Sequence, residues 1–131
     1  MNRLSNRSKS RLVGINEILV QIATEGVKDS PYDYGIPLTG GLRTAEDQNK
    51  LFRQKVSKCD GYRKLSYHQS GNAFDIYAYV DGKASWNIGY YQAIAKHLKE
   101  FAKINYGVTL LHGGDWKNFK DYPHFEIRNK K

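Results

Sequence analysis

The sequence predicts an α+β fold in which a small antiparallel β-sheet packs with about three helices. Early and middle segments repeat apolar residues at helical spacing, whereas short segments between and after them alternate apolar and polar residues as half-buried strands do. No repeat, low-complexity tract or Pro/Gly linker divides the 131 residues. Length and a hydrophobic content of 40% therefore favour one domain over residues 1–131, long enough to bury its own core.

Four apolar residues at helical spacing predict the first helix: Leu12, Ile15, Leu19 and Ile22. Gly26 stands where a C-cap would end that helix. Residues 36–42 are expected to form a short strand, at the edge of the sheet because Pro37 has no backbone N–H to donate.

A second helix is expected to begin after Thr44, whose hydroxyl can cap its N-terminus. Two acidic residues follow in its first turn, where the helix dipole favours them. Leu51 and Phe52 are predicted to face inward. The polar residues 57–65 then form a loop.

Strict alternation over residues 74–79 predicts a half-buried strand, and the Asp-Gly pair at 81–82 predicts the turn that follows it. Residues 108–111 and 124–127 are expected as two further short strands on either side of a Gly-Gly-Asp-Trp loop. The longest helix is predicted from six inward-facing residues: Tyr91, Ile94, Ala95, Leu98, Phe101 and Ala102.

Charge and cysteine content narrow the classes of function. The net charge of +8 indicates a polyanionic partner such as an anionic envelope polymer, and no nucleic-acid-binding signature accompanies it, so nucleic acid is not expected. A single cysteine, Cys59, excludes an internal disulfide and a cysteine-based structural zinc site. Residues 12–23 carry Asn16, Glu17 and Gln21, which argues against a signal peptide or membrane insertion.

Two clusters carry the residues typical of a hydrolytic metal site. His68 lies in a Ser/Gly-rich turn and Asp75 on the strand that leaves it, while Asp121 and His124 lie near the C-terminus. Two imidazoles, one carboxylate and a spare carboxylate are what a zinc hydrolase needs: three ligands, an open position and a base. Glu126 shares a strand face with His124, so the local sequence leaves it open as ligand, base or hydrogen-bond acceptor.

The motifs containing these residues resemble a known family. The pattern Ser66-x-His68-x-x-Gly71-x-Ala73-x-Asp75 is followed by Gly113-Gly114-Asp115-Trp116 and by Asp121-x-Pro123-His124-Phe125, and is preceded by Gly41-Leu42-Arg43-Thr44-x-x-x-Gln48. From about residue 12 to 127 the chain looks like the zinc peptidases that include D-Ala-D-Ala carboxypeptidases and VanX-type dipeptidases. Within that group it is most similar to phage L-alanyl-D-glutamate endopeptidases, which cut the peptide stem of bacterial peptidoglycan.

The resemblance implies a D-Ala-D-Ala peptidase-like fold with one Zn²⁺ per chain at the sheet, held by His68, Asp75 and His124. It makes Asp121 the general base and acid, and gives Arg43 the scissile carbonyl or a substrate carboxylate to hold. Six residues are expected to line the site or support its ligands: Ser66, Gln48, His112, Asp115, Trp116 and Glu126. His112 departs from the family, whose endolysins usually carry Trp there, so it is expected as a groove residue, a proton carrier or a packing replacement.

The same resemblance implies a phage lysis enzyme whose substrate is peptidoglycan. It would be a monomer made in the host cytoplasm, dependent on a separate holin to reach the periplasm, and without a separate wall-binding domain. Two alternatives stay open: a D-Ala-D-Ala carboxypeptidase acting on the same stem, and a non-catalytic basic module that binds the envelope or nucleic acid.

Overall fold

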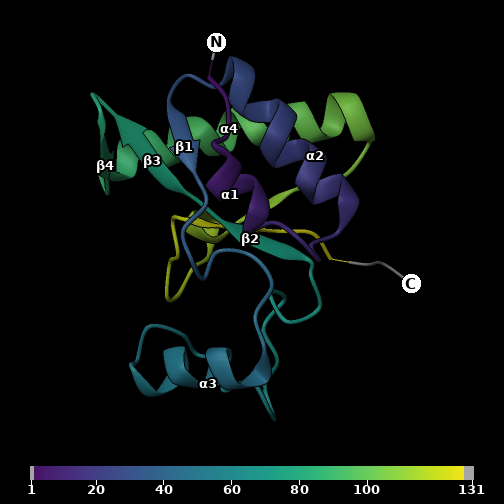
Figure 1. The fold of residues 1–131 in the computed structure, drawn as a ribbon, viewed down its shortest axis with the longest axis vertical. Helices are drawn as coiled ribbons and strands as arrows, with labels where there is room; N and C mark the ends of the chain where they lie inside the picture. The colour runs from purple at the N-terminus through teal and green to yellow at the C-terminus, as the bar shows by residue number, and fades with distance from the viewer. Residues whose placement is uncertain (1, 129–131) are drawn as a thin grey trace.

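The computed structural model of the chain describes residues 2–128. Helices α2 and α4 pack together at one end of the molecule with α1, whereas α3 lies at the opposite end, beyond β2 (Figure 1). Between residues 2 and 128, no helix is both long and apolar enough to cross a membrane. The helices are α1 (Asn6–Ser10), α2 (Glu17–Gly26), α3 (Ala45–Arg53) and α4 (Ile88–Tyr106), with short 3₁₀ turns η1 (Val27–Asp29) and η2 (Gly113–Asp115).

The strands form two three-stranded antiparallel sheets. One has the order β1-β3-β4 and the other β2-β6-β5. Only Ile76 separates β2 from β3, so one extended segment passes from the second sheet into the first. The strands are β1 (Asp33–Gly35), β2 (Ala73–Asp75), β3 (Tyr77–Val80), β4 (Lys83–Ser85), β5 (Leu111–His112) and β6 (His124–Glu126).

The predicted α+β class and the alternation over residues 74–79 are confirmed. Phe74, Ile76 and Ala78 are completely buried, and Phe74 stacks on Phe125 of β6 with ring centroids 5.5 Å apart. The core around them is completed by the apolar faces of α2 and α4. Thr44 caps α3 as predicted, because its hydroxyl accepts a hydrogen bond from the Asp47 N–H at 3.0 Å.

The strand predicted at residues 36–42 is wrong. Strand β1 ends at Gly35, and the chain then turns, with the Gly40 N–H donating to the Pro37 carbonyl at 2.9 Å. Pro37 cannot donate to a ladder, so the strand stops before it and the paired residues lie earlier in the chain. The strand was therefore predicted too late in the chain, at residues 36–42, where the backbone has already left the sheet.

Three further predictions are corrected. The helix predicted from Leu12, Ile15, Leu19 and Ile22 begins only at Glu17, as α2, so Leu12 and Ile15 are buried from the turns before it. Leu51 and Phe52 do not enter the core: Phe52 is 42% exposed, and the residue that α3 buries completely is Gln48. Helix α3 packs on polar loops rather than on the two sheets, so its inward face is polar. The strand expected at 108–111 begins later, as β5, and pairs with β6. Strand β4 and helix α1 were not predicted, because both are short and carry little apolar periodicity.

Candidate active site

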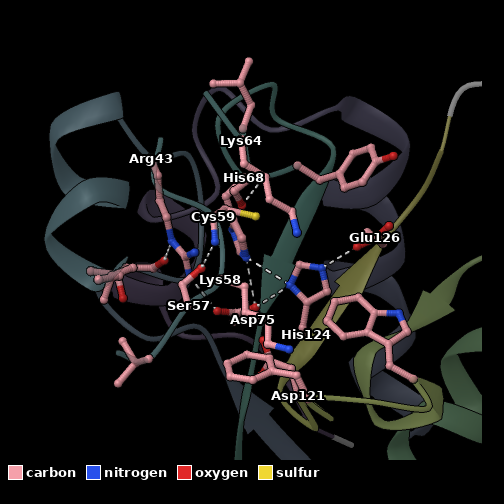
Figure 2. A pocket seen from close by; sticks show the side chains of 18 of the residues that line it. Arg43, Ser57, Lys58, Cys59, Lys64, His68, Asp75, Asp121, His124 and Glu126 are labelled. Carbon is pink, nitrogen blue, oxygen red and sulfur yellow. Dashed lines mark hydrogen bonds and ion pairs between the residues drawn. The ribbon is translucent and has the colours of Figure 1, made fainter. Parts of the chain in front are cut away.

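Three side chains from separate segments meet at the end of the second sheet. Asp75 and His124 are directly opposite each other in the antiparallel pairing of β2 with β6, and His68 reaches them from the turn before β2 (Figure 2). Nε2 of His68 lies 3.0 Å from Oδ1 of Asp75 and 3.2 Å from Nδ1 of His124, and that Nδ1 lies 3.1 Å from the same Oδ1. The strand register therefore builds the cluster.

Each of the three side chains is held from behind. Nδ1 of His68 donates to the Gly41 carbonyl at 2.9 Å, which leaves Nε2 free to present a lone pair. Nε2 of His124 donates to Oε1 of buried Glu126 at 2.7 Å, which leaves Nδ1 facing the cluster. Arg43 donates to Oδ2 of Asp75 at 2.9 Å, so Oδ1 points inward. Three electron-pair donors are thus aimed at one point.

The electrostatics of the cluster favour a bound cation. Burial alone would lower the pKa of His124, but its hydrogen bonds to Asp75 and Glu126 raise that pKa to about 9. Burial alone would raise the pKa of Asp75, yet the charge of His68 and the hydrogen bonds from both histidines hold it well below its usual range. The carboxylates of Asp75 and Glu126 thus lie next to the two imidazoles. The lone pairs of ligand atoms about 3 Å apart repel one another unless a proton or a metal ion lies between them.

The donor set fits a small divalent metal. A tetrahedral zinc site with bonds of about 2.0–2.1 Å has ligand atoms about 3.3 Å apart. The three contacts between His68, Asp75 and His124 measure 3.0–3.2 Å, close to that spacing. Two imidazole nitrogens and one carboxylate oxygen, each oriented by a hydrogen bond behind it, are donors of the kind that catalytic zinc sites use.

Asp121 lies beside the cluster in the same pocket. Its backbone is fixed on both sides, because its N–H donates to the Gly113 carbonyl at 3.0 Å and its carbonyl accepts from the His124 N–H at 3.1 Å. Burial and the negative charge of Asp75 raise the pKa of its carboxyl group. A carboxyl group of this kind can accept a proton from water and release it again.

The pocket that contains these groups has a volume of about 550 Å³ and opens between the loop after α3 and the segment before β6. Ser66 and Trp116 line it, as the sequence suggested. The Ser66 hydroxyl accepts the His68 N–H at 3.1 Å, and the Trp116 ring lies 5.1 Å from the His124 ring. Glu126 also borders the pocket, although its carboxylate is engaged by His124 and Arg128.

Arg43 and Gln48 form a polar network behind the cluster. Besides Asp75, Arg43 donates through Nε to the Thr39 carbonyl and through its other terminal nitrogen to Oε1 of Gln48 at 3.0 Å. Gln48 is completely buried, and its amide nitrogen donates to Ser57 and to the Cys59 carbonyl. Arg43 borders the pocket, whereas Gln48 lies behind it and anchors the loop after α3.

His112 and Asp115 do not line the pocket. His112 is buried, stacks on Phe125 at 4.8 Å and bonds through Nε2 to the Tyr122 carbonyl at 2.7 Å, so of the three sequence interpretations its position fits packing. Burial lowers its pKa, which also disfavours a charged role. Asp115 is exposed and pairs with Lys99 of α4.

Sequence reasoning missed Gly41 and two lysines. A Cβ on Gly41 would lie 1.8 Å from the Arg11 carbonyl, so only glycine fits where the acceptor for His68 is placed. Its place two residues before Arg43 in the first motif was the available signal. Lys58 and Lys64 also line the pocket, although the sequence predicted residues 57–65 only as a polar loop. Burial raises the pKa of Cys59, in keeping with a thiol that takes no part in the chemistry.

The chain is similar to known peptidases along nearly its whole length. A family model described as phage L-alanyl-D-glutamate peptidase matches residues 1–130. The L-alanyl-D-glutamate peptidase of Escherichia phage T5 is 29% identical over 127 residues, covering 96% of this chain and 89% of the relative. The peptidoglycan L-alanyl-D-glutamate endopeptidase CwlK of Bacillus subtilis is 30% identical over 119 residues, covering 83% and 71%. The crystal structure of the Serratia marcescens L-Ala D-Glu endopeptidase ChiX superposes with a TM-score of 0.83 at 29% identity, covering 98% and 90%.

Proposed function

The chain belongs to the phage L-alanyl-D-glutamate peptidase family, and from this premise we propose that it is a zinc-dependent endopeptidase of peptidoglycan. Its substrate is the L-Ala–D-Glu bond of the stem peptide, as the names of the relatives indicate for those proteins. One observation carries the proposal: three ligand-type atoms 3.0–3.2 Å apart border a pocket that also contains a carboxyl group with a raised pKa.

In this proposal His68, Asp75 and His124 hold the zinc ion. When bound, zinc polarises a carbonyl and lowers the pKa of water from about 15.7 to near 7. Asp121 accepts the proton that the attacking water loses and passes it to the leaving amine, for which its raised pKa suits it. The flanking Trp116 ring and the buried network behind Asp75 keep these groups in place.

Arg43 serves as a positioning residue in this scheme. All three of its guanidinium nitrogens already donate to protein acceptors, and one of these bonds fixes which oxygen of Asp75 faces the cluster. The interaction is an ion pair with both side chains largely shielded from solvent, so it orients the carboxylate strongly. The family resemblance had suggested a substrate contact instead, and these hydrogen bonds favour the positioning role.

The wider setting is also part of the proposal. A net charge of +8 would attract the protein to an anionic envelope. A single catalytic domain over residues 1–131, a monomeric state, synthesis in the host cytoplasm and release by a holin remain predictions from the resemblance.

Digestion of purified sacculi tests the function. Mass spectrometry of the released muropeptides should show new L-Ala carboxyl and D-Glu amino termini, and a chelator should abolish them. Released D-Ala would instead identify a carboxypeptidase acting on the same stem. Salt-sensitive binding without any product, at full zinc occupancy, would identify a non-catalytic module.

A further inference from the structure

The basic side chains that line the pocket are Arg43, Lys58, Lys64 and Arg128. The two arginines already donate hydrogen bonds to protein acceptors. Arg43 donates to Asp75, Gln48 and a backbone carbonyl. Arg128 bonds Glu126 at 2.6 Å and lies over the Tyr67 ring. The cations left for a ligand are therefore Lys58 and Lys64.

Neither of these lysines forms an ion pair within residues 2–128. The Lys58 ammonium lies 5.0 Å from the centre of the Phe119 ring, on the segment that faces it across the pocket. Lys64 lies close enough to lower the pKa of the Cys59 thiol, against the larger effect of burial. Both side chains reach into the pocket from the loop after α3 (Figure 2).

The loop that carries them is held firmly at its backbone. Oδ1 of Asp60 accepts the N–H groups of Tyr62, Arg63 and Lys64 at 2.9–3.0 Å. The Gln48 amide bonds the Cys59 carbonyl, next to Lys58, at 2.9 Å. Because the backbone at both lysines is fixed, binding an anion has to order only the two side chains and not the loop that carries them, which lowers the entropy cost of binding.

The acidic groups of the pocket mean that an anionic substrate needs positive charges beside it in order to bind. Asp75, Asp121 and Glu126 would repel an anionic ligand unless other charges offset them. A glutamyl residue inside a peptide uses one of its two carboxyl groups for the next bond, so the other remains as a carboxylate at neutral pH. In an L-Ala–D-Glu substrate that free carboxylate belongs to the residue whose nitrogen leaves.

We propose that Lys58 and Lys64 bind the free carboxylate of the D-Glu residue and so determine specificity for an acidic residue after the cut bond. The inference rests on the proposed function and deepens it. An ammonium–carboxylate hydrogen bond to an otherwise solvated lysine changes the specificity constant by about tenfold or more. Phe119 and Trp116 border the same space and supply apolar contact beside the anion.

The test uses two matched synthetic stem peptides, one with the free D-Glu carboxylate and one with a carboxamide in its place. The ratio of their kcat/KM values is measured for the zinc-loaded wild type and for the variants Lys58→Met and Lys64→Met. Lys96→Met is the control, since Lys96 is exposed on α4 and outside the pocket. Thermal melts verify that each variant is folded.

We expect the wild type and Lys96→Met to favour the carboxylate peptide by about tenfold or more, and the ratio to fall toward about one in the pocket variants. A wild type that cleaves both peptides equally would overturn the inference while leaving the proposed function intact. Pocket variants that keep the wild-type ratio would overturn it in the same way. Failure of the wild type to cleave either peptide would overturn the proposed function and the inference together.

Discussion

Replacing Glu126 with glutamine tests how strongly the carboxylate behind His124 controls the cluster. Glu126 is 1% exposed, and its two oxygens accept hydrogen bonds from His124 at 2.7 Å and Arg128 at 2.6 Å. Burial alone would raise its pKa, but these two bonds outweigh burial and hold the pKa below its usual value, so the group is ionised. Glutamine keeps the volume and one acceptor but removes the charge.

The expected loss follows from the hydrogen bond to His124. A hydrogen bond to a charged group contributes about 1.5–3 kcal/mol of net interaction energy, and a neutral hydrogen bond about 0.5–1.5 kcal/mol. Replacing the carboxylate with an amide therefore weakens the bond between residue 126 and His124 by about 1 kcal/mol or more. Loss of a carboxylate behind a metal-bound histidine lowers metal affinity about 10–100-fold. Arg128 is 52% exposed along its side chain and can turn to solvent, so its lost partner adds little. We expect Glu126→Gln to bind zinc about tenfold more weakly.

Competition with a chromogenic chelator measures zinc affinity for the wild type, Glu126→Gln and the control Asp115→Asn, which removes an exposed carboxylate outside the pocket. Peptide hydrolysis is then measured at saturating zinc, where a residue that only orients His124 leaves kcat within about threefold of wild type. Unchanged zinc affinity in Glu126→Gln would mean that the Glu126 carboxylate does not support the metal site through His124. A loss of about 10³ in kcat at full occupancy would instead make Glu126 the base.

Three other changes separate the roles assigned to the site. Asp121→Asn should keep the fold and zinc content but lower kcat for peptide hydrolysis by about 10²–10⁴, and retained lysis would move the base to Glu126. His112→Phe keeps the stack on Phe125 but loses a buried hydrogen bond, so urea unfolding should show about 1 kcal/mol less stability with hydrolysis unchanged; an inactive folded variant would contradict its packing role. Chelation should lower the melting temperature as well as the activity, because a bound metal stabilises only the folded state. Zinc should restore both, and a melting temperature indifferent to chelation would count against the cluster as a metal site.

Local chemistry in the sequence was enough to predict much of the fold. The alternation over residues 74–79 predicted a buried strand face, and the structure buries Phe74, Ile76 and Ala78 completely. The hydroxyl at Thr44 predicted a helix start. These features depend on neighbours within a few residues, so the sequence expresses them directly. The strand expected at 36–42 failed because the end of a strand depends on its partner, here β3, as well as on its own residues.

For the site, the residue types and motifs of the chain specify the inventory: two imidazoles, two carboxylates and the patterns that place them in a peptidase family. The geometry of these groups depends on the folded backbone. The register of β2 against β6 sets His124 opposite Asp75, and the Gly41 carbonyl selects the nitrogen of His68 that faces them. The fold also identifies Glu126, which the sequence left as ligand, base or acceptor, as the hydrogen-bond acceptor behind His124. It brings Lys58 and Lys64 of the loop after α3 to the pocket. These relations join residues up to 56 positions apart in the chain, and local sequence has no means of expressing contacts that only the folded backbone creates.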